Sequence, residues 1–296
     1  MIALRAASAA ATPTTSGVAR AGSAKEVGEL VQRIESAGEP MPAAIDALGA
    51  LTGSEATKAL GSLLSGGLPD AGTDRILERL VEHPRPATLD ALEAVARHRR
   101  PGARVLALRA IAALGMNDGK LAVSTSKLLA GGLRDSDARV RGTAASALGQ
   151  RFERLDREAQ GSRGAKPAGA APKVYEGVVD VLLLAVARGV PEAARAAGLA
   201  VPEATLPRLH EALRGLPLSA TLDAYDAALA RNTLSEAAKL DLIARLGEIA
   251  TPATKTFLST LIAKARFPLN SPLQRALIET EKRIVPRPAA TNGATP

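Results

Sequence analysis

The run Leu133-Arg-Asp-Ser-Asp-Ala-Arg-Val-Arg-Gly-Thr-Ala-Ala-Ser-Ala-Leu-Gly149 holds the strongest pattern in this sequence of 296 residues. Its closing tripeptide, Ala-Leu-Gly, also ends at Gly49 and at Gly115. Gly115 lies 66 residues after Gly49 and 34 residues before Gly149. The intervals therefore correspond to two periods of about 33 residues and then one. In the C-terminal half, Arg-Leu-Gly ends at Gly247, 98 residues after Gly149 and close to three further periods.

This period has a direct physical meaning. Two short antiparallel helices and their turns occupy about 30–40 residues. Alanines at helical spacing let neighbouring helices approach closely, and leucines fill the space between them. We expect each repeat glycine to end its helix in a left-handed conformation, which other residues adopt at a cost. Because one hairpin buries only part of its apolar surface, successive hairpins should stack.

The rest of the chain repeats the same theme of helices of about 12 residues separated by Gly, Pro or Asn. Ser23 and Glu26 form a capping-box pattern before the first helix, which stops at Gly38. Thr73 is expected to cap a later helix. Further helices are predicted from Pro42 to Gly53, from Ser54 to Leu64, and at about 87–98, 102–114, 119–130, 136–158, 174–188, 191–199, 203–214, 218–231, 234–249, 252–266 and 272–284. No segment shows strand alternation, so the predicted fold is an all-α solenoid of about six or seven antiparallel hairpins.

Composition divides the chain into five parts. Residues 1–22 are rich in Ala, Ser, Thr and Gly and are predicted to form a flexible arm. Two sets of repeats, 23–159 and 173–285, are separated by a Gly/Ala/Pro tract at 160–172 that is predicted to be a mobile loop. The tail at 286–296 contains three prolines and is expected to be disordered.

The quoted run resembles a HEAT repeat of the short bacterial type, also called PBS-lyase HEAT-like. The usual pattern of that family is Leu-x-Asp-x-Asp-x-x-Val-Arg-x-x-Ala-Ala-x-Ala-Leu-Gly. The residues at matching positions are Asp135, Asp137, Val140, Arg141, Ala144, Ala145, Leu148 and Gly149. The resemblance covers residues 23–285 as architecture, and it is readable as a pattern at about 40–150 and 233–266. It implies an α-solenoid that presents a surface to a partner, usually another protein.

Other repeats match this pattern less well. The segment before Gly115 places Ala103 and Ala107 where the family has Asp and Arg. We therefore expect the ladder of Asp–Arg contacts typical of the family to be incomplete. Within the matching repeat, the resemblance implies a structural pair between Asp137 and Arg141, which are four residues apart and can meet on a helix.

Positive charge is concentrated in the middle of the chain. The formal net charge is +8, and the interval from Arg97 to Lys166 holds 15 Lys/Arg against six Asp/Glu. On a stacked solenoid, such residues align into a stripe that attracts an acidic protein segment, a phosphate backbone or anionic lipid. The candidate binding residues are Arg97, Arg99, Arg100, Arg104, Arg109, Arg139, Arg151 and Arg154.

A simpler interpretation of the same arginines stays open. Arg151 and Arg154 alternate with acidic residues, as on a solvated helix face. The group from Arg97 to Arg100 lies at a predicted helix C-terminus, where cations are favourable without any partner.

Several chemical classes have little support. The chain has no cysteine, so disulfides, thiolate zinc sites and cysteine nucleophiles are excluded. Its three histidines, His83, His98 and His210, show no metal-ligand spacing, and no phosphate-binding glycine loop or nucleophile motif is present. We predict no cofactor, no metal and no catalytic residue. Carboxylate pairs distant in the sequence remain an open possibility.

Partner and location are predicted only in outline. Aromatic residues make up 2% of the chain, which disfavours a reader of single strands or RNA because such proteins stack bases on aromatic rings. No run reaches the 18–20 apolar residues of a membrane span. The default expectation is a cytoplasmic protein. The absence of cysteine fits the periplasm equally well, and a trimmed export signal at the N-terminus stays open.

The sequence therefore predicts a non-enzymatic scaffold or adaptor that docks a helix or a disordered acidic segment of a protein partner on an extended face. The alternative is an anion-binding module that uses the basic centre on nucleic acid or membrane phosphates. A third class, a lyase that attaches bilins or another enzyme, rests on an analogy of fold alone.

Overall fold

The computed structural model describes residues 20–36, 41–161 and 176–284. Within these ranges the chain forms fifteen α-helices, and the only β-type pairing is a single bridge between Ala21 and Thr52. Residues 20–22 of the expected arm thus pair with Thr52. The rest of that arm, most of the expected loop at 160–172 and the expected tail lie outside the described residues.

The helices lie close to the predicted positions. Those before the 162–175 gap are α1 (Ala24–Glu35), α2 (Met41–Ala50), α3 (Ser54–Ser65), α4 (Asp70–Glu82), α5 (Leu89–Val95), α6 (Pro101–Asn117), α7 (Ala122–Gly132) and α8 (Ala138–Gly161). Those after it are α9 (Glu176–Ala187), α10 (Ala194–Ala200), α11 (Leu206–Leu213), α12 (Leu218–Ala230), α13 (Glu236–Ile249), α14 (Pro252–Ala263) and α15 (Pro272–Arg283). Short 3-10 turns precede three of them, at η1 (Pro86–Thr88), η3 (Pro191–Ala193) and η4 (Glu203–Thr205).

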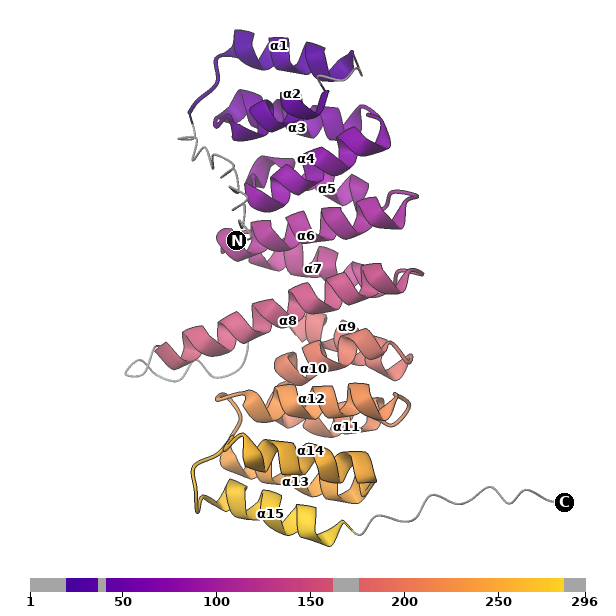
Figure 1. Cartoon of the computed structure of the whole chain (residues 1–296), viewed down its shortest axis with the longest axis vertical. Helices are drawn as coiled ribbons and strands as arrows, with labels where there is room; N and C mark the ends of the chain where they lie inside the picture. Colours follow the sequence, from indigo (N-terminus) through magenta and orange to yellow (C-terminus); the bar gives the residue numbers. More distant parts are fainter. Residues whose placement is uncertain (1–19, 37–40, 162–175, 285–296) are drawn as a thin grey trace, which may run out of the picture.

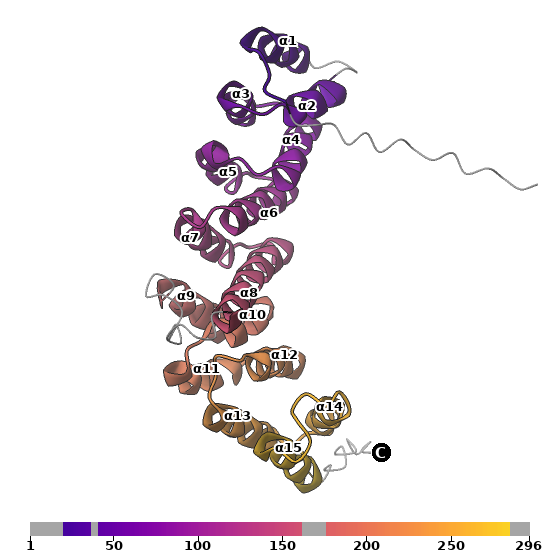
Figure 2. The same ribbon diagram turned by 90° about the vertical axis from the view of Figure 1, so that its left-hand side faces the viewer.

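The helices form one long stack, in which each hairpin contacts the hairpins before and after it (Figure 1). Figure 2 shows two layers side by side: the one on the right consists of α2, α4, α6, α8, α10 and α12, and the one on the left of α3, α5, α7, α9 and α11. The stack bows, and the first of these layers lies on the inside of the curve. We call its six helices the inner layer. Contact restricted to neighbouring hairpins defines a solenoid, so the predicted all-α solenoid is confirmed.

Side-chain caps fix several helix starts. The Ser23 side chain accepts a hydrogen bond from the backbone N–H of Glu26 at 3.2 Å, as the capping box predicts. Ser235 and Ser271 cap α13 and α15 in the same way. The prediction for Thr73 is wrong, because α4 already begins at Asp70 and Thr73 lies inside the helix, 9% exposed.

The repeat glycines serve a different purpose from the predicted one. Gly49, Gly115, Gly149 and Gly247 lie inside α2, α6, α8 and α13, and none has a positive φ. Instead, at Gly49, Gly115 and Gly247 a neighbouring side chain lies so close that a Cβ would crowd it, whereas at Gly149 a Cβ would make only ordinary contacts. At Gly115 the space of a Cβ is taken by the guanidinium of Arg151 and the hydroxyl of Thr125. The first three glycines therefore allow close packing between helices, and none of the four ends its helix.

The closest packing joins α10 to α12. A Cβ on Gly198 would overlap the backbone carbonyl of Ala224, and Ala197, Ala224 and Ala228 are fully buried nearby. Backbone atoms cannot move aside as a flexible side chain can. The approach of these two helices therefore depends on the absence of a side chain at residue 198.

Replacing Gly198 by alanine tests this packing. We expect Gly198→Ala to lower the free energy of unfolding by about 2 kcal/mol, since the added methyl group overpacks the contact. Gly28→Ala is the matched control, because Gly28 lies exposed in α1 and its Cβ would meet nothing within 4 Å. That change should stabilise the chain by up to about 1 kcal/mol through helix propensity. Urea denaturation measures both, and equal effects of the two variants would contradict the packing described.

Candidate functional site

Three of the eight candidate residues, Arg97, Arg99 and Arg100, lie in a turn on one edge of the stack, and the other five lie in α6 and α8. The turns that join α5 to α6, α7 to α8 and α9 to η3 lie along the right-hand side of Figure 1. We call these three turns, residues 96–100, 133–137 and 188–190, the turn edge. It brings together charges from three successive hairpins, as the expected stripe requires.

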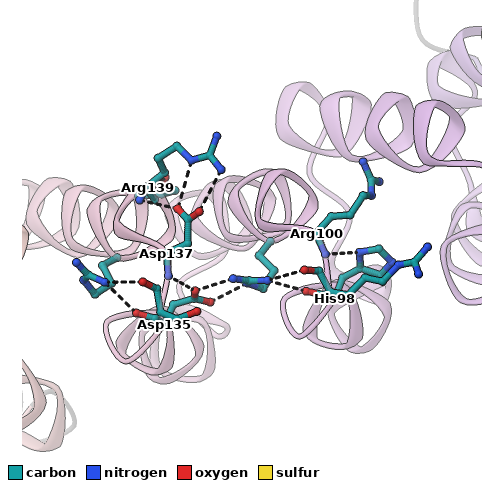
Figure 3. A network of polar contacts seen from close by, with 10 residues as sticks. His98, Arg100, Asp135, Asp137 and Arg139 are labelled. Atoms are coloured by element: carbon teal, nitrogen blue, oxygen red, sulfur yellow. Dashed lines mark hydrogen bonds and ion pairs between the residues drawn. The ribbon is translucent and has the colours of Figure 1, made fainter.

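Arg104 is held firmly inside this edge. Its guanidinium makes two hydrogen bonds of 2.7 Å to the carboxylate of Asp135, and it also donates to the carbonyl oxygens of His98, at 2.9 Å, and Arg99 (Figure 3). The two charged side chains are only 12% and 14% exposed. Arg104 therefore connects the start of α6 to the α7–α8 turn, and little of it is available to a partner.

The expected pair between Asp137 and Arg141 does not form. Asp137 instead bonds its neighbour, Arg139, through both the side chain at 3.1 Å and the backbone N–H at 2.8 Å (Figure 3). The hydrogen bond from the Arg139 side chain is the main reason that the pKa of Asp137 falls to about 2. Arg141 turns the other way and reaches Glu192 at 3.4 Å. The pair that the resemblance implies is therefore wrong, and each of the two residues has a different partner.

Similar ion pairs connect the whole inner layer. Asp46 of α2 accepts from Arg75 and Arg79 of α4, and Arg100 pairs with Asp70 and Asp74 of α4. The Arg104–Asp135 and Arg141–Glu192 pairs join α6 to α8 and α8 to the start of α10. Arg195 of α10 contacts Glu153 of α8 at 2.9 Å and Asp226 of α12 at 3.9 Å.

We call this series the ion-pair ladder. It links successive inner helices from α2 to α12, but through other residue pairs than the Asp–Arg ladder of the family, whose Asp137–Arg141 pair does not form. The reason is that the acid and the arginine come from different positions in different hairpins. A pattern built from one repeat shows only one of these combinations.

Arg151 is also structural. It is 4% exposed and donates to the carbonyl of Ala122 and to the hydroxyls of Thr125 and Ser126, which fastens α8 to α7. The expectation that Arg151 lies on a solvated helix face is therefore wrong. Because its side chain is buried, Arg151 is not accessible to a partner at the surface. Arg154 is partly exposed, donates to the carbonyl of Met116 and pairs with Glu158 at 2.6 Å.

Four of the eight candidate residues remain exposed. Arg97 pairs with Glu93 and Arg139 with Asp137, in contacts of the exposed kind that add little stability. Arg99 lies on the turn edge and Arg109 on α6, and within the described ranges neither has an acidic partner. Since charges without internal partners are the ones a ligand can use most readily, Arg99 and Arg109 are the stronger binding candidates of the four.

Two exposed arginines of the turn edge were not among the candidate binding residues, although Arg134 lies in the basic interval. Arg134 lies in the α7–α8 turn and Arg188 in the α9–η3 turn, and no ion pair joins either to the described part of the chain. Arg134 could have been found, because it directly precedes Asp135 of the repeat motif. Arg188 had no signal of its own, because its hairpin matches the repeat poorly.

His210 lies in a separate pocket of about 470 Å³ formed by α11, α12 and α13. Its ring stacks on Tyr225 with 5.6 Å between ring centres, and its Nδ1 lies 2.9 Å from the tyrosine hydroxyl. Burial lowers the pKa of His210, although nearby Asp241 opposes this, and burial raises the pKa of Tyr225 to about 12. The tyrosine hydroxyl thus pairs with Nδ1 of His210, while Nε2 lies 3.4 Å from a carboxylate oxygen of Asp241.

Two further properties concern the described residues alone. They contain no group of three or more His, Asp or Glu side chains arranged to hold a metal ion. None of their helices is both long enough and apolar enough to cross a bilayer.

No protein-family model matches the chain, and no curated protein matches it. Among solved structures, it is similar to human deoxyhypusine hydroxylase in complex with glycerol, with 20% identity over 88% of this chain and 94% of that one and a TM-score of 0.39. Two engineered proteins are also similar. One has 17% identity over 87% of this chain and 68% of its own, with a TM-score of 0.37. The other has 16% identity over 88% and 96%, with a TM-score of 0.30.

The class of the fold follows from the molecule itself. Stacked hairpins that contact only their neighbours make the described part of this chain an α-solenoid. The solved structures add nothing about what the chain binds.

Two arginines of α6 allow the effect of a largely buried ion pair on stability to be compared with that of an exposed arginine. Arg104→Ala should lower the free energy of unfolding by about 2–3 kcal/mol, because it leaves Asp135 and two carbonyl groups without their donor. Arg109→Ala is the control on the same helix and should change stability by less than about 0.5 kcal/mol. Chemical denaturation of both variants measures the difference. A small effect of Arg104→Ala would show that the ladder contact contributes little.

The ladder also predicts how stability depends on pH. The pKa of Asp46 lies below its ordinary value of 3.8, chiefly through the hydrogen bond from Arg75. Burial raises the pKa of Asp135. Its hydrogen bonds to Arg104 and to the Asp137 backbone together lower that pKa by more than burial raises it, so the net shift is downward. A lowered carboxylate pKa stabilises the folded state at pH values above the unfolded pKa, and this stabilisation disappears as pH falls through the folded value.

Unfolding free energy should therefore decrease as pH falls below about 4. Asp135→Asn has one such carboxylate fewer, so its stability should change less over the same interval. Denaturation at a series of pH values checks this. Parallel curves for the two proteins would contradict the assigned role of Asp135.

Proposed function

We propose that this protein is a non-enzymatic scaffold or adaptor that docks a protein partner along its extended face, using the turn edge. The observation that carries the proposal is the set of exposed arginines there: Arg99, Arg134 and Arg188 come from three successive hairpins, and each lacks an acidic partner within the described ranges. Unpaired charges repeated at successive turns suit a partner that lies across several repeats.

The ion-pair ladder supports such a role. It fixes each inner helix against the next, and Arg104 fixes the α7–α8 turn against α6. The edge side chains are therefore presented by a preorganised frame, so that docking orders few groups and loses little affinity to entropy. Positive potential along the edge would steer an acidic segment of a partner toward it.

The alternative, a module for nucleic acid or membrane phosphates, draws on the same arginines and has less support. Arg100, Arg104 and Arg151 donate to groups within the protein. Phe152, the one aromatic residue of the basic interval, is 3% exposed and cannot stack on a base. A protein partner needs neither a dense phosphate-binding surface nor an aromatic platform.

Site-specific photo-crosslinking tests the proposal. A photoreactive phenylalanine analogue replaces Arg99 in cells of the native host. The matched control replaces Lys120, which is exposed in the α6–α7 turn on the opposite edge. We expect a defined protein adduct from position 99 and none from position 120. Equal labelling from both positions, or adducts only to nucleic acid or lipid, would overturn the proposal.

Salt titration of the purified complex distinguishes a protein partner from a phosphate-binding partner. Binding to phosphates through six or more contacts should weaken roughly 10³-fold between 50 and 200 mM salt. A docked protein segment that buries apolar surface should show a much smaller decrease.

A further inference from the structure

A pocket of about 350 Å³ opens on the turn edge between the α7–α8 turn and α9. Its floor is apolar and includes Leu133, Val181, Leu184 and Val190. Gly189 has a φ of 79°, which lets the chain turn sharply after α9 and places Arg188 and Val190 around the same opening. We call this feature the edge pocket.

The floor of the edge pocket is unusual in its exposure. Leu184 is 41% exposed, and among the described residues Leu269 is the only other large apolar side chain exposed to solvent. Val181 and Ala185 lie one helical turn before and one residue after Leu184, and both also line the pocket. An apolar side chain placed on this floor would remove water from an already concave surface, which is favourable.

The rim of the edge pocket is positively charged. Arg134 lies on one side and Arg188 on the other, and neither has an acidic partner within the described ranges. The remaining charges cancel, because Asp135 is paired with Arg104 and Arg141 with Glu192. The pocket therefore combines apolar residues with two arginines, from different hairpins, that lack an acidic partner within the described ranges.

We propose that the edge pocket docks an acidic segment of a protein partner. One apolar side chain of that segment inserts over Leu184, and carboxylates on either side of it bind Arg134 and Arg188. Guanidinium groups bind carboxylates through two parallel hydrogen bonds, which sets orientation as well as charge. This inference rests on the proposed function and names the place and the partner chemistry that it uses.

A peptide-display selection on the intact chain tests this proposal. The library holds peptides of about 12 residues, in which Asp or Glu, Lys or Arg, and apolar residues occur with equal frequency. Enriched peptides are synthesised with a fluorophore, and their affinities are measured by polarisation. The test variants are Arg134→Glu with Arg188→Glu, and Leu184→Ser. The controls are Arg283→Glu in α15 and Leu269→Ser between α14 and α15, at exposed residues far from the pocket. Circular dichroism verifies that every variant is folded.

We expect enrichment of acidic peptides that carry a large apolar residue. Their affinity should fall on the order of tenfold or more in the double arginine variant and about as much in Leu184→Ser, with the controls within about twofold of the parent. If the enriched peptides bind all variants equally, the proposal for the edge pocket is overturned and the scaffold proposal is not. Enrichment of basic peptides would have the same meaning.

Two other occupants are outcomes of the same measurement. Vesicles of anionic phospholipid and a labelled DNA duplex are titrated alongside the peptides. If either binds more tightly than the acidic peptides and loses binding in the same variants, the pocket takes phosphates and the peptide proposal is wrong. If neither peptides nor a crosslinked protein bind the chain at all, the proposed function fails as well.

Discussion

Close approach between small-residue helices is the constraint on which the rest of this structure depends. The core contains almost no aromatic side chains and is built from Leu, Ala, Val and Ile, so neighbouring helices can pack with little space between them. At α10 and α12 the absence of a side chain on Gly198 brings helix against backbone. This spacing lets an arginine of one hairpin reach an acidic residue of the next. The ion-pair ladder is therefore a consequence of the packing, and it in turn fixes the register of the turns at the surface.

Much of the fold could be predicted from the sequence. The period of Ala-Leu-Gly reports the length of a hairpin, and breaks at Gly and Pro place most helix ends within a few residues. The role of the glycines could not be predicted. A glycine near a helix end is typical of a left-handed turn, and only the neighbouring helix shows that Gly115 instead leaves space for Arg151.

The candidate site was predictable to a smaller extent, for a related reason. The sequence shows where positive charge is concentrated, but it does not show which arginines are already paired. Arg104 meets an acid 31 residues away, and Arg141 meets one 51 residues away across the 162–175 gap. Such partners depend on how hairpins stack. The edge pocket could not be predicted from the sequence either, because Arg134 and Arg188 belong to different hairpins. The sequence around Leu184 also gives no sign that this leucine is exposed and not buried.

In this arrangement, stacked hairpins form a frame, and the arginines without acidic partners in the described ranges at the turns lie along its edge. Distances between spin labels along the inner layer test this arrangement most directly. Labels replace Arg109 on α6, Gln150 on α8 and Asp223 on α12, all exposed and outside the ladder. Pulsed electron paramagnetic resonance should give a narrow distribution of short distances between the labels on α6 and α8, and clearly longer distances between those on α6 and α12. Similar distances for the two pairs would indicate a compact bundle and contradict the stacked solenoid.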